Sequence, residues 1–309
     1  HAERSKASAR HLAIGATGKG CSEALIDRIR NRNHDATLFG SSPYVHDYNV
    51  CDTEAFLNFR WNEGAQLLLE GTQGQLLDLY LGPYPYTTHK QTGPAQWMLE
   101  AGLSPSLPTE IVMVIRTFPI RVAGNSGPLP GEISWPILAR DINLTRIGKG
   151  LRPLVYDGAL KEFEYAVRRA AAEFATPLYS DGNDQHQWTA EERHRFKSAA
   201  SEIHATAWKM LTDGAKAELS NLFEMTTVTK KLRRIAFLDR TSTEIAARQI
   251  RPSWVAITFM NYLYPEYWYE RPKPTDVAPL DFIRKIEEAC KASVKLLSYG
   301  PEDKHVVEV

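Results

Sequence analysis

Short runs of apolar residues alternate along the chain with longer stretches in which apolar residues recur at helical spacing. The short runs at 66–69, 111–115 and 254–259 predict strands, and the last two are typical of strands buried on both faces. Helices are predicted at 22–32, 52–63, 89–101, 160–175, 190–211 and 239–250, and a final helix and strand within 280–297. This alternation predicts an α/β fold, built as one large domain or two small ones.

The block from Trp135 to Glu224 is mostly helical in pattern. We interpret residues 136–225 as a helical insertion that covers one side of the sheet. Three histidines in this block, His186, His194 and His204, invite a metal site. No two of them form the i, i+4 pair with an intervening glutamate that a helical zinc motif requires, so a solvated polar face is the favoured interpretation.

The stretch from Gln66 to Thr88 combines several features of a binding site. Small and polar residues, including Gln73, follow its predicted strand, and ligands of open α/β sheets collect beyond the carboxyl ends of strands. The prolines and glycine at 82–86 then fix an irregular turn that presents Thr87 and Thr88. On pattern alone, a proline-ordered loop without chemistry is as good an interpretation as a binding site.

Three further segments could bind anions. A glycine-rich turn contains Lys19 but lacks the Walker pattern, so it is either a phosphate-binding turn before a helix or a plain tight turn. Arg121 precedes another glycine turn, where a solvated arginine is the favoured alternative. Residues 226–234, here called the basic loop, contain four cations and three hydroxyls, and this composition favours an anion clamp over a solvated surface loop.

Composition narrows the choice of partners. Lysine plus arginine and aspartate plus glutamate both number 37, so no global field would recruit nucleic acid or an anionic membrane. The three cysteines are far apart, which favours a reducing compartment over a disulfide framework. No apolar run approaches the roughly 20 residues of a membrane-spanning helix, and no signal peptide is recognisable. We therefore predict a cytoplasmic protein without nucleic-acid or membrane partners.

The segment EGTQGQLLDLYLGPYPYTT resembles EGAQGxLLDxxxGTYPYVT of adenylosuccinate synthetases. This resemblance implies that Gln73 and Thr88 hold a purine nucleoside monophosphate. IGATGKG resembles the family's IGTTGRGIGP and implies the same role for Thr17, while Asn31 falls at the position of an arginine that reaches across the family's dimer. FPIRVAGNSGPLPGEI resembles YxTRVGxGPFPTEL with two extra residues, and it places Val122 where the family's chain passes the nucleotide.

The basic loop resembles TTGRPRRxGWFD, the aspartate loop of the same family. The resemblance implies aspartate-binding roles for Thr229, Lys231, Arg233 and Arg234. Lys231 stands where the family has an arginine. Lysine keeps the positive charge but loses the bidentate fork, so the contact to ribose or substrate must differ.

Two later segments resemble those that bind the base of the nucleoside triphosphate. WVAITFMNYL matches LTKLDVL, with Phe259 and Asn261 in place of the lysine and aspartate that recognise guanine, and Ser298 and Gly300 fall on STGPxRxxT. Asparagine offers one donor and one acceptor, as adenine requires, whereas aspartate accepts from two N–H groups of guanine. We therefore expect ATP to be preferred over GTP, with an ordinary strand end at Asn261 as the alternative.

Together these segments imply a P-loop-NTPase-like α/β fold with a mostly parallel central sheet flanked by helices. The fold would be a single domain, residues 1–309, that lacks the family's amino-terminal part and carries the 136–225 insertion. The implied activity is that of a carbon–nitrogen ligase of purine biosynthesis, which joins IMP to L-aspartate at the expense of GTP or ATP with Mg²⁺, as a homodimer. We also expect Thr17, Gln73 and Thr88 to converge on one pocket.

The family's GDEGKGK loop, general base, catalytic histidine and magnesium ligands belong to the amino-terminal part that this sequence does not contain. No catalytic residue or metal ligand is therefore assigned, and we expect the chain to be inactive alone. Two alternatives stay open. One is the phage-type enzyme that acts on dGMP with ATP, favoured by Lys231 and Asn261, and the other is a non-catalytic nucleotide-binding relic.

Overall fold

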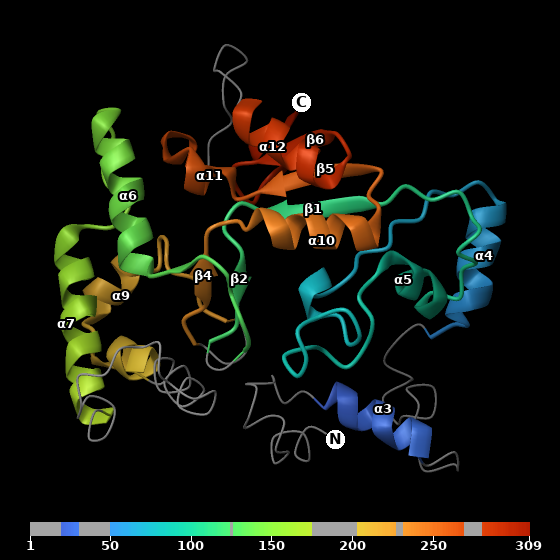
Figure 1. Cartoon of the computed structure of the whole chain (residues 1–309), viewed down its shortest axis with the longest axis horizontal. Helices are drawn as coiled ribbons and strands as arrows, with labels where there is room; N and C mark the ends of the chain where they lie inside the picture. The colour runs from blue at the N-terminus through green and yellow to red at the C-terminus, as the bar shows by residue number, and fades with distance from the viewer. Residues whose placement is uncertain (1–19, 31–49, 124–125, 175–202, 227–230, 269–279) are drawn as a thin grey trace.

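The structure is a computed structural model. It describes residues 20–30, 50–123, 126–174, 203–226, 231–268 and 280–309. These residues form two β-sheets with helices packed around them (Figure 1). Within these ranges, no helix is both long enough and apolar enough to cross a membrane.

The larger sheet has four strands in the order β1-β5-β6-β7. Strands β1 (Val112–Arg116), β5 (Trp254–Thr258) and β6 (Val294–Ser298) run parallel, and β7 (Val306–Glu308) is antiparallel to β6. Helices α10 (Arg240–Ile250) and α12 (Leu280–Cys290) share a buried apolar cluster with these strands. The mostly parallel sheet flanked by helices confirms the predicted fold class.

Strand β1 is not buried on both faces, contrary to the prediction from its unbroken apolar run. Met113 and Ile115 lie in the apolar cluster, whereas Val112 and Val114 are exposed, Val114 to 65%. Successive side chains of a strand point to opposite faces, and the described helices cover one face of this strand. Strand β5 alternates in the same way, between buried and half-buried residues.

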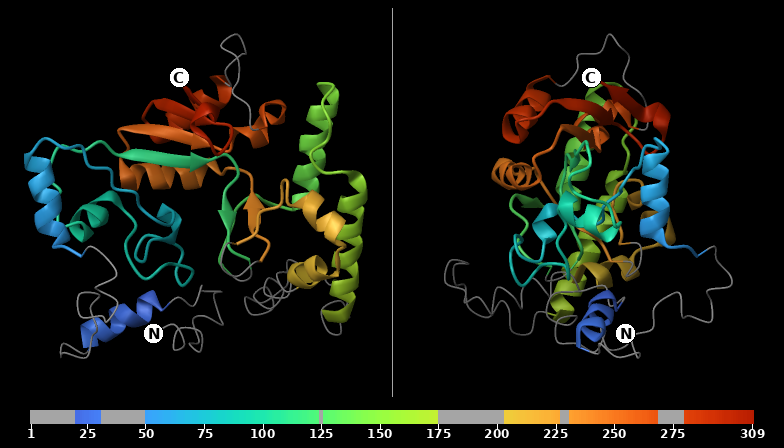
Figure 2. Two further views of the ribbon diagram at one scale, coloured as in Figure 1. Left: turned by 180° about the vertical axis from the view of Figure 1, so that it is seen from behind. Right: turned by 90° about the vertical axis from the view of Figure 1, so that its right-hand side faces the viewer.

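The smaller sheet has three short antiparallel strands in the order β2-β4-β3. They are β2 (Ile120–Arg121), β4 (Arg234–Ala236) and β3 (Glu132–Ile133). Helices α6 (Trp135–Gly148), α7 (Asp157–Phe174), α9 (Asp213–Leu219) and the helix at 203–210 form a second apolar cluster with this sheet. These helices stand at one end of the molecule, beyond the small sheet (Figure 2).

The helical block therefore packs on the small sheet. The sequence analysis had placed it on one side of the central sheet. Its apolar faces pack around Phe118, Ile235 and Tyr262. Because the small sheet and the ends of the long strands supply that apolar surface, the block extends the fold sideways and does not form another layer on the four-stranded sheet.

Several helix boundaries agree with the sequence pattern. Helix α3 (Cys21–Arg30) overlaps the first predicted helix, and α4 (Thr53–Asn62) is capped by Asp52, whose carboxylate accepts from Ala55 N at 3.1 Å. Helix α10 starts at Asp239, which accepts from Ser242 N at 2.7 Å. Helix α5 (Pro94–Glu100) is shorter than predicted because Gly93 and Pro94 set its start.

Residues 66–69 do not form the predicted buried strand. They pair with no strand among the described residues, and Leu68 is 91% exposed. A short apolar run forms a strand only where a neighbouring strand accepts its hydrogen bonds, and this run has none. The remaining described elements are short: η3 (Gln75–Leu77), α11 (Met260–Leu263), η5 (Pro265–Tyr267) and η6 (Asp303–His305).

Candidate functional site

A buried aspartate shapes the loop between Gln73 and Thr88. Asp78 is 1% exposed, and its carboxylate accepts from Tyr80 N at 2.9 Å, Leu81 N at 3.1 Å and Thr92 N at 2.7 Å. A carboxylate that receives several backbone N–H bonds is a strong organiser of an irregular loop. The sequence analysis assigned Asp78 no role. The signal was one acid inside the apolar run LLDLYL, just before a glycine–proline turn.

Gln73 and Thr88 lie at the two ends of this loop and are joined through η3. Thr88 N donates to Leu77 O at 2.7 Å, and Leu77 N donates to Gly74 O at 2.8 Å. Gln73 is exposed and has a left-handed φ of 67°, which a non-glycine residue adopts at a cost. Thr17, the third residue predicted for this pocket, lies outside the described residues, so its convergence stays a prediction.

The loop is attached to both sheets. Gln75 Nε2 donates to Gln249 Oε1 of α10 at 3.0 Å. Arg121 Nη2 of β2 donates to Leu76 O at 3.5 Å, and Nη1 donates to Ser126 O. One arginine thus connects the Gln66–Thr88 stretch with the small sheet. The basic loop leads into strand β4 of that sheet.

Arg121 and Arg234 are directly opposite each other on β2 and β4. Arg234 donates to both carboxylate oxygens of Glu132, at 2.7 and 2.5 Å, and to Gly127 O at 2.7 Å. Arg121 has no acidic partner among the described residues; burial lowers its pKa, and the charge of Arg234 lowers that pKa further. Two cations share this corner with one carboxylate, which favours an additional anion nearby.

The turn after β2 is tightly packed. Val122, predicted to pass the nucleotide, is 38% exposed, and its carbonyl accepts from Ser126 Oγ at 2.6 Å. Gly127 has a φ of 97°, and a Cβ there would lie 2.5 Å from the side chain of Tyr86. Glycine is therefore required where this turn meets the Gln66–Thr88 stretch.

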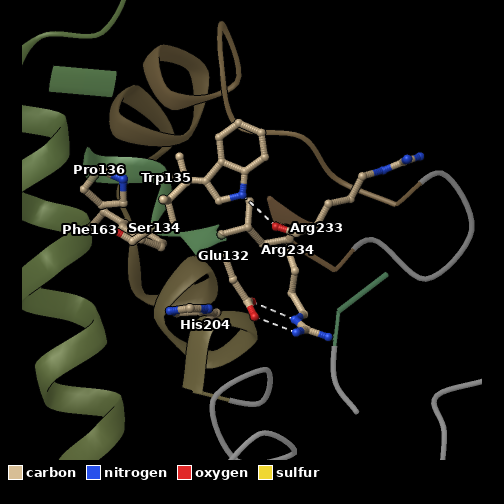
Figure 3. A pocket seen from close by; sticks show the side chains of 10 residues that line it. Glu132, Ser134, Trp135, Pro136, Phe163, His204, Arg233 and Arg234 are labelled. Atoms are coloured by element: carbon tan, nitrogen blue, oxygen red, sulfur yellow. Dashed lines mark hydrogen bonds and ion pairs between the residues drawn. The ribbon is translucent and has the colours of Figure 1, made fainter. Parts of the chain in front are cut away.

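The basic loop leaves the core beside Trp135 and His204 (Figure 3). Trp135 Nε1 donates to Arg233 O at 2.6 Å, and Arg233 N donates to Glu224 O at 2.8 Å, so the backbone of Arg233 is held from both sides. The Arg233 side chain points away from the Arg234–Glu132 pair, and its buried Nε has no hydrogen-bond partner among the described residues. Lys231 is exposed. Thr229 lies outside the described residues.

The residues predicted to bind the triphosphate base lie at the carboxyl ends of parallel strands. Arg116 pairs in register with Thr258, and Ile257 with Leu297, so the chain after β1, β5 and β6 leaves the sheet at the same edge. Phe259 directly follows β5, and Ser298 ends β6 with its Oγ donating to Gly300 O at 2.8 Å. The register therefore brings the Phe259–Asn261 and Ser298–Gly300 segments to one edge, as ligand sites of open α/β sheets require.

Asn261 is the most unusual polar residue at this edge. It is 3% exposed, although its side chain ends in a polar amide. Phe259, two residues earlier, has a φ of 60°, and its carbonyl accepts from Thr117 Oγ1 at 2.6 Å. An amide offers one donor and one acceptor, so the Asn261 side chain could pair with the edge of a purine base.

Metal-ligating side chains are scattered over the described residues. In the described part of the chain, no three histidine, cysteine, aspartate or glutamate side chains gather in a way that could hold a metal ion. His186 and His194 lie outside the described ranges, and His204 packs against Phe163 with ring centroids 6.0 Å apart.

The fold and the polar strand ends define an α/β protein that binds ligands at one edge of a mostly parallel sheet. The model of the adenylosuccinate synthetase family matches residues 41–264, which is more than half of the chain. The chain therefore belongs to the adenylosuccinate synthetase family. Thr17, Ser298 and Gly300 lie outside the matched range.

Individual relatives agree with this assignment. The adenylosuccinate synthetase of Methanococcus maripaludis is 37% identical over 137 residues, which are 43% of this chain and 38% of that protein. The enzyme of Thermococcus onnurineus is 37% identical over 136 residues, with the same two shares. The chain is thus matched over well under half the length of these curated relatives.

A solved structure shows the same fold. Succinoaminodeoxyadenylate synthetase (PurZ) of cyanophage S-2L, bound to dGMP and to dATP as an energy donor, superposes with a TM-score of 0.55 at 21% identity. The match covers 100% of this chain and 65% of the phage protein.

Proposed function

We propose that this chain binds the substrates of a ligase that joins a purine nucleoside monophosphate to L-aspartate, with hydrolysis of a nucleoside triphosphate. The observation that carries this proposal is the link made by Arg121. Its guanidinium connects Leu76, inside the monophosphate-binding segment, to the small sheet from which the aspartate-binding arginines emerge. Two segments with different family roles, far apart in sequence, are thereby held side by side.

The monophosphate subsite is assigned to Thr17, Gln73, Thr88 and Val122. The strained backbone of Gln73 supports this assignment, because such strain persists where the surroundings enforce it and is concentrated at functional sites. The uncompensated positive charge of Arg121 beside this loop favours an anionic ligand such as a phosphate.

The aspartate subsite is assigned to Thr229, Lys231, Arg233 and Arg234. The two arginines differ in what they can offer. Arg234 already donates to Glu132, so it positions the loop, whereas the guanidinium of Arg233 points away from that pair and is assigned to the carboxylate of aspartate. The base of the triphosphate is assigned to Phe259, Asn261, Ser298 and Gly300 at the edge of the large sheet.

The proposed reaction follows from the family. The triphosphate phosphorylates the purine 6-oxygen, the amine of aspartate attacks carbon 6, and phosphate leaves with that oxygen. The side chains assigned here bind and orient the three substrates, which removes much of the entropic barrier to reaction between them. None of them is assigned as a catalytic base. Mg²⁺ would supply charge neutralisation for the triphosphate; homodimer formation and a cytoplasmic location complete the proposal.

A second candidate is the same reaction on dGMP with ATP as the energy donor. The observation that favours it is the buried Asn261 at the end of β5, whose amide can donate to and accept from an adenine edge. The solved phage relative carries dGMP and dATP, which agrees with this alternative. IMP with GTP is the first outcome to be tested against it, and a non-catalytic nucleotide-binding relic is another.

The test is calorimetric titration of the full chain with IMP, dGMP, ATP, GTP and L-aspartate, followed by an assay of phosphate release. We expect one monophosphate and one triphosphate to bind, and Arg233→Ala to raise the aspartate requirement about ten- to hundredfold, because a charged contact contributes roughly 1.5–3 kcal/mol. Arg248→Ala, at an exposed arginine of α10, is the matched control.

Three results would be decisive. Phosphate release that depends on aspartate supports a ligase, whereas nucleotide binding without turnover supports the expectation that the chain is inactive alone or a relic. Absence of all nucleotide binding by the wild-type chain overturns the proposed function.

A further inference from the structure

Arg116 occupies an unusual environment at the carboxyl end of β1. Its Nη2 forms an ion pair with Glu224 Oε1, and its Nε donates to Phe118 O at 2.6 Å. The guanidinium carbon lies 3.4 Å from the centroid of the Phe259 ring. A guanidinium this close to an aromatic face is held by cation–π attraction as well as by its ion pair. No part of the sequence analysis singled out this residue.

Glu224, the partner of Arg116, stands at the root of the basic loop. Its Oε1 also accepts from Tyr262 Oη at 2.7 Å, and its backbone carbonyl accepts from Arg233 N at 2.8 Å. Only 16% of the Arg116 side chain and 20% of the Glu224 side chain are exposed, so solvent screens this pair little. A displacement of Glu224 would therefore move the backbone of Arg233.

Phe259 stands at the other end of the same chain of contacts. Its ring meets Tyr262 edge-on at 5.5 Å, and Tyr262 stacks on Trp268 at 5.2 Å. The left-handed backbone of Phe259 is costly, and a phenylalanine keeps such a conformation only where its surroundings enforce it. Arg116 and Tyr262 supply that enforcement two residues before Asn261.

We propose that Arg116 is a positioning residue that joins the triphosphate-base subsite, Phe259 and Asn261, to the root of the basic loop through Glu224. This inference rests on the proposed function for the identity of the two subsites. A base that packs against Phe259 favours the orientation of Phe259 that stacks on Arg116, and the Arg116–Glu224 pair then fixes the backbone from which Arg233 reaches aspartate. Triphosphate binding therefore strengthens aspartate binding, and aspartate strengthens triphosphate binding by the same factor.

A purely structural role for Arg116 is the competing explanation, because the loss of one member of a largely buried ion pair destabilises many proteins. Arg140 offers a control in a more exposed ion pair, with 41% and 34% of the two side chains exposed. It pairs with Glu164 at 2.8 Å and connects α6 with α7, away from both subsites. Arg116→Met and Arg140→Met each remove one ion pair between separate segments, but only the first is placed to uncouple the subsites.

The first experiment needs no ligand and compares amide hydrogen exchange in the full chain. We expect Arg116→Met to accelerate exchange at two separate places, residues 231–236 and residues 259–264, while Arg140→Met accelerates neither. Arg116→Lys keeps the charge without the planar guanidinium, so it should give an intermediate result. Acceleration in Arg116→Met that is confined to β1, or equal in both methionine variants, would overturn the proposal.

The second experiment measures the affinity for L-aspartate by calorimetry, with and without saturating ATP, at a fixed concentration of the monophosphate that binds. We expect ATP to tighten aspartate binding about fivefold or more in the wild type and in Arg140→Met. The ratio should fall to about one in Arg116→Met. A wild-type ratio of one, or a ratio unchanged by Arg116→Met, rejects the coupling.

The two experiments separate failure of this inference from failure of the proposed function. If the wild-type chain binds neither ATP nor aspartate, the proposed function is wrong. The exchange experiment then still decides whether Arg116 holds the two segments together.

Discussion

The polar side chains of the small sheet and those at the carboxyl edge of the large sheet have different roles. In the small sheet, the guanidinium of Arg234 donates hydrogen bonds to Glu132, Ser126 and Gly127. At the edge of the large sheet, Asn261 is buried as deeply as a core residue, and we propose that its amide pairs with the base of the triphosphate. Side-chain hydrogen bonds within the protein therefore stabilise the first region, and the second is the region proposed to bind a ligand.

The same contrast separates two neighbours in the basic loop. Arg234 faces inward and carries the structural ion pair, whereas the next residue back, Arg233, points away from that pair and keeps an unbonded Nε. Adjacent residues of a strand point to opposite sides, which gives this loop one arginine for the fold and one for an anion. The following predictions test this division, beginning with the largest effect.

The core under the small sheet should be the most sensitive part of this comparison. Ile235 of β4 is fully buried between the sheet and the helical block. We expect Ile235→Ala to lower the free energy of unfolding by about 2–5 kcal/mol, measured by urea denaturation. Leu144→Ala, on the exposed side of α6, is the control and should change it by less than about 0.5 kcal/mol. Equal losses in both variants would mean that the small sheet is not a structural core.

The two arginines should separate stability from binding. Arg234→Met leaves Glu132 and the turn carbonyls without their donor, so we expect a loss of about 1.5–3 kcal/mol in the free energy of unfolding. Arg233→Met removes no side-chain hydrogen bond of the described residues and should cost under about 1 kcal/mol, while it weakens aspartate binding. Denaturation and calorimetry on both variants measure this. The reverse order of stability losses would refute the assignment.

Local signals in the sequence were enough to predict many elements. Asp52 and Asp239 cap helices because their carboxylates reach backbone N–H groups three residues on, and this depends on neighbouring residues alone. Strand β5 followed from an apolar run in the same way. The segment 66–69 has a similar run but does not form a strand. Strand formation depends on a neighbouring strand, which no local pattern specifies.

The parts of the site that were missed depend on contacts between distant segments. Asp78 matters through Thr92, and Arg116 matters through Glu224 and Phe259, which are more than a hundred residues away. The position of the helical block was missed for the same reason. Its amphipathic helices require an apolar surface, but their pattern does not say which of the two sheets supplies it.

Asn261 offers the sharpest test of the ligand-binding region. In Asn261→Asp, the amide donor is lost and two acceptor oxygens face the base, so we expect the preference to move from ATP toward GTP by about tenfold, or roughly 1.4 kcal/mol. Competition between ATP and GTP for the full chain measures the shift, and Asn58→Asp on α4, far along the chain from β5, is the control. A wild-type preference for GTP of more than about tenfold would make Asn261 an ordinary strand-end residue.

The smallest expected effect is a pH dependence at His204, where the helical block meets the small sheet. Burial lowers the pKa of His204, and the nearby carboxylate of Glu132 only partly opposes this. The unfolded chain therefore takes up a proton first as the pH falls below about 6.5, so the stability that neutral His204 contributes is present above that pH and is lost below it. In His204→Gln this loss should disappear. The difference in unfolding free energy between wild type and variant should therefore be constant from pH 7 to 8. Toward pH 5, the unfolding free energy of the wild type should fall relative to that of the variant. A shift in favour of the wild type at low pH would mean that Glu132 outweighs burial and holds a protonated His204, and this corner would then be a charge cluster with three members.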